Sequence, residues 1–375
     1  MSGAGGESTI PLADPRGDMA DLRDKIVQAV TATIDSGSYI LGNEVAAFEG
    51  SMAARLGTPG TVGVGSGTDA IALALLAVGV RPGDEVITVS HTAGATAVAI
   101  QMIGAVPVLV DIANDTYGLD AGAIEGAIGS CTRAILPVHL YGHPADMKAI
   151  GAVAGRHDIS IVEDCAQAQD ATIDDRAVGT FGNVGCFSFY PTKTLGALGD
   201  GGLIASTESD LVNRARLLRA YGWRRPQFSE LPGGRCSRLD ELQASILRVK
   251  LDRLTKDVEN RRAVASRYNE ELAGLPIILP TEQPGCRHVY HLYVIRCDRR
   301  DGLAQYLRRV GVATGIHYEY PVHLQPGLAE RCRIAGSLQT TEAVVRDILS
   351  LPIYPSLTEQ SQDRVIAGVR AFFGR

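Results

Sequence analysis

Lys193 and Asp164 are the two residues of this sequence whose types and surroundings point most strongly to chemistry. Asp164 ends the apolar run ISIVED (159–164), which is typical of a buried strand, and ligands of parallel sheets bind at such carboxyl ends. A carboxylate buried there needs a cationic partner, because an isolated charge out of water is very costly. Lys193 follows in a loop punctuated by Pro and Gly, and a lysine amine desolvated beside a cation loses its proton more easily. The two residues therefore predict a site for imine formation and proton transfer.

Each of these residues also has an ordinary interpretation when it is taken alone. An Asp-Cys pair at the end of a strand is most often a cap or a turn, and a lysine in a loop usually lies at the surface. The combination of Asp164 with the segments SFYPTK (188–193) and GDGG (199–202) favours the chemical interpretation.

A possible phosphate site is the turn Gly65-Ser66-Gly67-Thr68, which follows the run TVGV (61–64) and opens a stretch with helical spacing. Backbone N–H groups at a helix N-terminus, unobstructed by side chains, suit a phosphate. A short Gly-Ser turn with a threonine N-cap explains the pattern about as well. The turn is not G-x-G-x-x-G, so it gives little support to a dinucleotide-binding fold.

His91 follows the apolar run EVITVS (85–90) and so stands at the end of a second expected strand. Its ring could lie against the face of an aromatic ligand, or it could satisfy a backbone carbonyl. The sequence supports the two interpretations equally.

The elements that must position these residues are short apolar runs that alternate with amphipathic stretches. The runs are TVGV (61–64), EVITVS (85–90), VPVLVD (106–111), AILPVHL (134–140), ISIVED (159–164), GCFSFY (185–190) and GLIAS (202–206). Such alternation predicts an α/β fold in which a mostly parallel seven-stranded sheet lies between helices.

The C-terminal part has a different pattern. Residues 238–273 form a long charged amphipathic stretch that predicts a long helix with room for a kink. Strand candidates at 291–297 and 313–317, a helical stretch at 301–310 and two terminal helices follow. We therefore expect a large domain with an N-terminal arm (1–255) and a small C-terminal α+β domain (256–375), with the boundary near 255–275.

Composition excludes several classes of function. Of the 375 residues, 45% are hydrophobic and 21% are charged, which is typical of a soluble globular protein. The net charge of −6 argues against a nucleic-acid or membrane-surface partner. The seven cysteines are scattered without a C-x-x-C pair, so we expect reduced thiols, no disulfide frame and no metal site. The first residues, MSGAGGESTIPL, do not look like a secretory signal, and we expect a cytoplasmic protein.

Many segments, in order along nearly the whole chain, resemble the DegT/StrS-type sugar aminotransferases. The resemblance is carried by SGSYILGNEVAAFE (36–49), VGSGTDAIAL (64–73), VSHTAGATAVAI (89–100), EDCAQAQDA (163–171), FSFYPTKTLGALGDGG (187–202) and GIHYEYPVHLQPGL (315–328). Those enzymes belong to fold type I and depend on pyridoxal 5'-phosphate (PLP). The family is dimeric, so the resemblance implies a homodimer in which each active site is completed by the neighbouring chain.

Matched by position, the resemblance implies roles for the residues described above. Lys193 would form the Schiff base with PLP, and Asp164 would pair with the pyridine nitrogen. Gln167 would contact the ring or its 3-hydroxyl. The phosphate would be held by Gly67, Thr68 and Ser188.

Two positions depart from the family pattern. Many relatives carry an aromatic residue after the threonine of the VSHT segment, where this chain has Ala93, so His91 is the expected ring-stacking residue. Relatives usually read G-x-N-S-R-L-D, with the asparagine reaching across the dimer to the cofactor phosphate. Here Cys236 stands at the asparagine position, and cysteine is a weak hydrogen-bond donor. The contact to the cofactor is then weakened, or is made instead by Arg235 or Arg238.

The activity that the resemblance implies is transamination in amino-sugar biosynthesis, for an antibiotic or a polysaccharide. An amino donor, L-glutamate by analogy, would convert PLP to pyridoxamine 5'-phosphate (PMP), and the amine would then pass to a dTDP-linked keto-6-deoxyhexose. Residues expected to bind substrate are Tyr318, His317, His323 and Arg224 or Arg225, although solvated surface charges are the commoner interpretation of such residues.

Three alternatives remain at this point. The acceptor could be a keto-cyclitol. A PLP-dependent sugar dehydratase is disfavoured, because the dehydratases of this family have a histidine where Lys193 stands. A PLP-binding regulator or inactive partner subunit is favoured only by the missing asparagine. The sequence does not distinguish amination at C3 from amination at C4.

Overall fold

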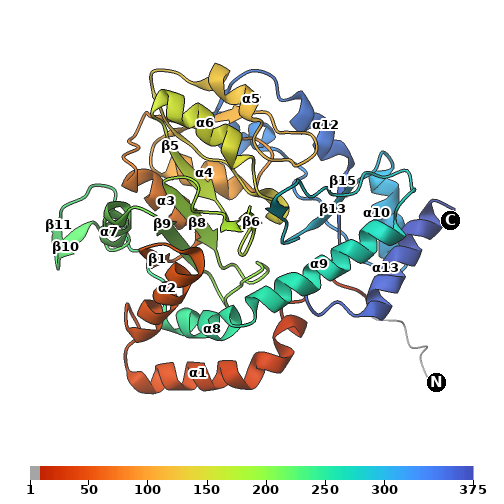
Figure 1. The fold of residues 1–375 in the computed structure, drawn as a ribbon, viewed down its shortest axis with the longest axis horizontal. Helices are drawn as coiled ribbons and strands as arrows, with labels where there is room; N and C mark the ends of the chain where they lie inside the picture. The colour runs from red at the N-terminus through yellow and green to blue at the C-terminus, as the bar shows by residue number, and fades with distance from the viewer. Residues whose placement is uncertain (1–8, 375) are drawn as a thin grey trace.

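A sheet of eight strands runs through the molecule in the order β1-β9-β8-β5-β4-β2-β3-β14 (Figure 1). The structure is a computed structural model and describes residues 9–374. The strands are β1 (Gly60–Val64), β9 (Gly202–Ser206), β8 (Val184–Ser188), β5 (Ser160–Asp164), β4 (Thr132–Ile135), β2 (Glu85–Val89), β3 (Val106–Val110) and β14 (Arg333–Ile334). Only β9 runs against its neighbours, because it pairs antiparallel with both β1 and β8. The carboxyl ends of the other strands therefore meet at one edge of the sheet.

All seven strands predicted from the apolar runs are present in this sheet. The eighth strand, β14, has two residues and comes from the C-terminal part of the chain, where no apolar run predicts a strand.

The prediction of a strand at 313–317 was wrong. In that region Val312 bridges to Ile10 and Gly315 bridges to Ser350, but no continuous ladder forms. The strand β13 (Tyr293–Arg296) pairs antiparallel with β15 (Ile348–Leu351), and Gly315 meets the opposite edge of β15 at Ser350 alone. The N-terminal arm, through Ile10, occupies the backbone beside Val312.

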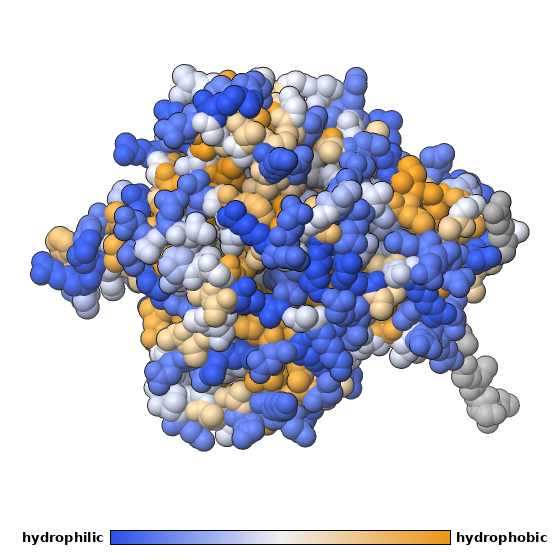
Figure 2. All heavy atoms as spheres, in the orientation of Figure 1, coloured by the Kyte–Doolittle hydropathy of each residue, from blue (hydrophilic) through white to orange (hydrophobic). Residues whose placement is uncertain are grey.

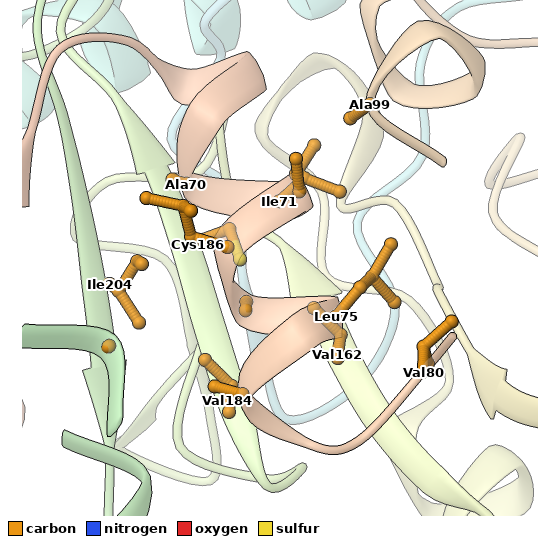
Figure 3. Packing of buried hydrophobic residues seen from close by; sticks show 14 of the residues in the cluster. Ala70, Ile71, Leu75, Val80, Ala99, Val162, Val184, Cys186 and Ile204 are labelled. Carbon is orange, nitrogen blue, oxygen red and sulfur yellow. The ribbon is translucent and has the colours of Figure 1, made fainter. Parts of the chain in front are cut away.

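One face of the sheet is covered by α3 (Gly67–Ala77), α4 (Gly94–Met102) and α7 (Ser209–Leu218). Figure 3 shows Ala70, Ile71 and Leu75 of α3 packed over strand residues such as Val162 and Val184. These strand residues alternate with others that face the opposite side, as the two-residue period of a strand requires. A continuous apolar core therefore fixes α3 against the middle of the sheet.

The opposite face is covered in two parts. Over β2 to β5 lie α5 (Ala121–Ile124), α6 (Met147–His157) and α12 (Gln339–Asp347), and over β8 and β9 lie α2 (Asn43–Leu56) and α8 (Glu241–Leu251). The sheet is thus buried on both faces, which explains why its strands read as apolar runs.

The long stretch 238–273 forms two helices, α8 and α9 (Leu254–Glu271), separated by Asp252 and Arg253. A separate cluster of buried residues gathers around α9, α10 (Arg300–Arg309), α13 (Glu359–Phe372) and the β13–β15 pair, and Ile10 of the N-terminal arm joins it. This group lies to one side of the large sheet in Figure 1. The division into domains at residue 255 stays a prediction.

Smaller elements complete the fold. They are α1 (Arg23–Ser36), α11 (Pro326–Ala329), a three-stranded sheet of β12 (Cys286–Arg287), β6 (Thr172–Ile173) and β7 (Arg176–Ala177), and a hairpin of β10 (Trp223–Arg225) and β11 (Phe228–Ser229). The hairpin projects from the edge of the molecule beyond α7 (Figure 1).

The surface drawn in Figure 2 is mainly hydrophilic, with apolar residues in scattered groups. Within residues 9–374, every helix is too short or too polar to cross a lipid bilayer.

The N-terminus of α2 is capped by a residue far away in sequence. The N-cap residue, Gly42, has no side chain to accept a hydrogen bond. Instead, the buried carboxylate of Glu241, at the start of α8, accepts hydrogen bonds from the backbone N–H groups of Gly42 (2.7 Å), Glu44 (2.8 Å) and Val45 (3.0 Å). These N–H groups have no acceptor within the helix, and the carboxylate supplies one for each of them. Its negative charge also interacts favourably with the positive end of the helix dipole.

We expect Glu241→Ala to lower the free energy of unfolding by about 3 kcal/mol, because it leaves buried backbone donors unsatisfied. Urea denaturation of the purified protein measures this change. The control is Glu44→Ala in the same helix turn, which removes only a partly exposed ion pair with Arg248 and should cost less than about 1 kcal/mol. Equal losses in the two variants would contradict the capping role.

Candidate active site

Lys193 and Asp164 line the same cavity, at the edge where the parallel strands end. This first cavity has a volume of about 240 Å³. The other predicted site residues that line it are Gly67, Thr68, Gln167 and Ser188. The fold thus gathers six predicted residues from α3, the ends of β5 and β8 and the loops after them. Another cavity, of about 740 Å³, lies at the C-terminal end of α3 and is not lined by Lys193.

Asp164 is buried, with 4% of its surface exposed. Its carboxylate accepts hydrogen bonds from the hydroxyl of Thr96 (2.9 Å) and from the backbone N–H of Ala166 (3.0 Å). Burial raises the pKa of Asp164 above its ordinary value, although both donors oppose that effect. Among residues 9–374, no ion pair is formed by this carboxylate. A cationic ligand in the first cavity would supply the charge that the carboxylate lacks.

Lys193 lies in the loop between β8 and β9. Burial lowers the pKa of Lys193 to about 8, and the negative charge of Asp164 acts in the opposite direction. A lysine with such a pKa is neutral in a substantial fraction of molecules near neutral pH, as a nucleophile must be. Its side chain also lines a second cavity, of about 260 Å³, together with Tyr190. The amine therefore stands between two cavities.

The N-terminus of α3 opens into the first cavity. Ser66 caps the helix by accepting a hydrogen bond from the backbone N–H of Asp69 (3.1 Å). Gly67 packs so closely on Ser188 that an added Cβ would lie 2.5 Å from the Cβ of that serine. This close contact therefore requires glycine at position 67. The start of α3 lines the first cavity, and the helix dipole makes it suitable for a phosphate.

Gln167 is held rigidly beside this cavity. Its Oε1 accepts a hydrogen bond from the backbone N–H of Tyr141 (2.7 Å), and its Nε2 donates to the hydroxyl of Tyr318 (2.8 Å). One N–H of its amide group is left, because an amide nitrogen carries two donors. The structure thus leaves Gln167 one donor for a ring substituent.

His91 lies outside the first cavity. It is fully buried, its Nε2 is 2.7 Å from the hydroxyl of Tyr141, and its ring meets Tyr117 and Tyr141 edge to face. Burial lowers the pKa of His91 to about 4, so the ring is neutral. Ala93, two residues on, lines the cavity instead. The position of His91 therefore does not support the predicted role of stacking on the cofactor ring.

Two further predicted residues lie away from the first cavity of their own chain. Cys236 is exposed, and its sulfur accepts a hydrogen bond from Arg238 (3.0 Å). Arg224, on the projecting β10–β11 hairpin, is exposed and paired with Glu230, whose Oε1 is 2.6 Å from its Nη2. Its neighbour Arg225 lies over the ring of Phe228.

The three remaining predicted substrate residues are divided between two places. His317 and Tyr318 line the second cavity. His317 is tied to Ser350 by a hydrogen bond of 2.8 Å between Nδ1 and Oγ. His323 lies elsewhere, 2.7 Å from the hydroxyl of Ser90.

Sequence reasoning missed several residues that the fold brings to the site. Thr96, which bonds Asp164, and Ala166 line the first cavity, and Arg261 and His291 line the second. Thr96 and Ala166 lie within segments quoted for the resemblance, so their motifs were a usable signal. Arg261 carries no such signal, because it lies in the middle of a long charged helix.

The first cavity fits a ligand with three features. A phosphate would meet the start of α3, a protonated ring nitrogen would meet Asp164, and a carbonyl carbon would be within the reach of the Lys193 amine. Pyridoxal phosphate has all three, and the buried carboxylate without a cation of its own is the observation that tests the fit.

Residues 20–370 match the DegT/DnrJ/EryC1/StrS aminotransferase family. The "Erythromycin biosynthesis sensory transduction protein EryC1" of Saccharopolyspora erythraea is 46% identical over 96% of this chain and 99% of its own length. The "dTDP-3-amino-3,4,6-trideoxy-alpha-D-glucose transaminase" of Streptomyces venezuelae is 44% identical over 100% of this chain and 99% of its own length.

A crystal structure of DesV from S. venezuelae, in complex with a ketimine intermediate, is also similar to this structure. Its TM-score is 0.95 at 44% identity, with 98% of this chain and 99% of the DesV chain covered. The match therefore extends over nearly the whole fold. The chain therefore belongs to the DegT/DnrJ/EryC1/StrS aminotransferase family and is a sugar aminotransferase that depends on pyridoxal phosphate.

Proposed function

We propose that this protein transfers the amino group of L-glutamate to C3 of a dTDP-linked keto-6-deoxyhexose. The observation that carries the proposal is the first cavity, in which Lys193, Asp164 and the open N-terminus of α3 meet. The printed name of the S. venezuelae relative supports both the dTDP group and the position of the nitrogen, since it describes a 3-amino sugar. A keto-cyclitol acceptor has no corresponding support in the structure.

The chain's own residues divide the work of the reaction. Pyridoxal phosphate, when bound, supplies an electron sink next to the carbon that gains or loses the amine. Asp164 would hold the proton on the ring nitrogen, because its carboxylate is buried among neutral donors only. The Lys193 amine would take and return the proton at the substrate carbon, for which a pKa of about 8 is well placed. Gly67, Thr68 and Ser188 would anchor the phosphate.

We also infer that the protein is a homodimer in which the two chains share their active sites. We infer that it is located in the cytoplasm. The β10–β11 hairpin and the loop to Cys236 project from the protomer and do not line its own first cavity, which suits a contribution to a neighbour's site. Arg224 would then act on the substrate of the neighbouring protomer. The side chain is exposed and its partner Glu230 comes from the same hairpin.

A regulatory protein that binds PLP without turnover is a second candidate. The name of the S. erythraea relative, which describes sensory transduction, favours it. The presence of Lys193 with a lowered pKa favours catalysis instead.

The decisive experiment offers the holoenzyme and L-glutamate a panel of keto sugars and follows 2-oxoglutarate. The panel contains dTDP-linked 3-keto and 4-keto sugars and a keto-cyclitol. We expect turnover with the dTDP-3-keto sugar at least tenfold above the others, and none with Lys193→Ala, which lacks the reacting amine. Turnover with the 4-keto sugar or cyclitol alone would refute the acceptor, and turnover with none would favour the regulator.

The pH dependence of cofactor capture tests the environment of Lys193. Only the neutral amine attacks a carbonyl, so covalent retention of PLP by the apoprotein should rise with pH and level off above a midpoint near 8. Asp164→Asn removes the negative charge that raises this pKa, so its midpoint should be lower. Borohydride treatment followed by mass spectrometry measures the retained fraction. A midpoint near that of a solvated lysine would show that the amine is not desolvated.

The cysteine at position 236, where relatives usually have asparagine, leads to a prediction about the affinity for PLP. If this loop reaches the neighbouring phosphate, asparagine would donate a better hydrogen bond than the thiol, and Cys236→Asn should tighten PLP binding about two- to 150-fold. Equilibrium dialysis gives the dissociation constants. Cys131→Asn, at another exposed cysteine, is the control and should leave affinity unchanged. Equal or weaker binding in the Cys236 variant would mean that the contact across the dimer is absent.

A further inference from the structure

The second cavity lies against the reactive amine but is built differently from the first. Lys193 and Tyr190 line both cavities, so the two cavities adjoin at the lysine. Its walls come from the N-terminal arm, the lysine loop, α9 and the segments near His291 and His317. No aspartate or glutamate is among the described residues that line it.

Arg261 gives this cavity a buried positive charge, since only 3% of its surface is exposed. Its Nη1 donates to the backbone oxygen of Ile353 (2.9 Å), but its Nε has no hydrogen-bond partner. Asp18 and Asp257 are the acidic groups that act on its charge, yet Asp18 accepts from Ser356 and Asp257 pairs with Arg253. Within residues 9–374 the guanidinium has no carboxylate of its own, which is costly for a buried cation.

His291 adds a second unsatisfied group to the same cavity. It is buried, with 7% of its surface exposed, and its Nδ1 has no hydrogen-bond partner among the described residues. Most buried polar atoms in proteins have a partner, and here two residues that line one cavity each carry a nitrogen without one. A ligand that supplies acceptors beside these two side chains would offer them partners. A carboxylate carries two acceptor oxygens and a negative charge, which match a guanidinium and an imidazole N–H.

The volume of the second cavity indicates which of the two substrates, the amino acid or the nucleotide sugar, it can hold. Pockets for drug-sized ligands have volumes of about 300–1,000 Å³, so a cavity of about 260 Å³ suits a small amino acid better than a whole nucleotide sugar. Leu12, Leu292 and Ile353 supply apolar wall for a short methylene chain.

We propose that Arg261 and His291 bind a carboxylate of the amino-acid donor in the second cavity, beside Lys193. The inference rests on the proposed transamination, and it assigns donor recognition to the second cavity. Arg261 is then a specificity-determining residue for the first half of the reaction only.

The test compares the two half-reactions of the holoenzyme through the absorbance of its bound cofactor. The PLP form is mixed with L-glutamate or L-alanine, or with the dTDP-linked 3-amino sugar that reacts in the reverse direction. Arg261→Lys keeps the charge but loses the planar guanidinium, and His291→Leu removes the orphaned nitrogen. The matched control is Arg262→Lys, at the next residue of α9, whose guanidinium bonds Glu282 and the backbone oxygen of His288 and does not line the cavity.

We expect Arg261→Lys and His291→Leu each to raise the half-saturating concentration of L-glutamate about tenfold or more, equivalent to losing one charge-assisted hydrogen bond. The amino-sugar half-reaction and the Arg262→Lys control should stay within about twofold of the wild type. An equal loss with L-alanine assigns the contact to the α-carboxylate, and a loss with L-glutamate alone assigns it to the side-chain carboxylate.

Two results would overturn the inference while the proposed function stands: unchanged donor saturation in both variants, or equal damage to both half-reactions. If Arg261→Lys does not retain PLP, His291→Leu decides alone. Failure of the wild type to react with L-glutamate while it reacts with the amino sugar would remove the proposed donor, and this inference with it.

Discussion

The site depends on keeping the carboxylate of Asp164 out of water without an ion pair within residues 9–374. The backbone of Asp164 is held against the segment that follows β4, because its N–H donates to the carbonyl of Pro137 and its carbonyl accepts from the N–H of His139. The preceding residue, Glu163, is fully buried and accepts hydrogen bonds from Gly179 (2.7 Å) and Gly182 (2.6 Å). Two adjacent carboxylates at a strand end are thereby held by backbone donors. Asp164, which lines the cavity, forms no ion pair within residues 9–374, so a cationic ligand in the cavity would be stabilised by its charge.

The parallel sheet explains how distant residues reach that carboxylate. β1 precedes the α3 turn, β5 ends in Asp164, and β8 ends in Ser188 before the lysine loop, and these three strands point the same way. Their carboxyl ends therefore share one edge, where ligands of open α/β sheets bind. Because each apolar run is buried on both faces, the runs were visible in the sequence, and so were the residues that follow them. This is why Lys193, Asp164, Gly67, Thr68, Ser188 and Gln167 could be placed together before the structure was known.

Other features depend on contacts that no local pattern records. His91 stands at a strand end as expected, but the hydroxyl of Tyr141 holds it inside the core, and nothing in its own segment indicates that tyrosine. The expected strand at 313–317 is reduced to isolated contacts, because Gly315 meets β15 only at Ser350 and the neighbouring Val312 bridges to Ile10 of the N-terminal arm. Arg261 reads as one more charge on a polar helix, and only the fold turns it toward a cavity. In each case the deciding partner is far away in sequence.

The antiparallel strand β9 and the distant cap on α2 also set an order of events during synthesis. β1 has its only sheet neighbour in β9, residues 202–206, and α2 is capped by Glu241. At the usual rate of about 5–20 residues per second, roughly 10–40 seconds separate the emergence of β1 from that of Glu241. Through that interval the nascent chain carries a strand with an unpaired edge and a helix with an uncapped end. The segment 43–64, which holds α2 and β1, therefore reaches its final structure only after Glu241 has left the ribosome. Until then a chaperone or a neighbouring nascent chain is the available partner for that edge.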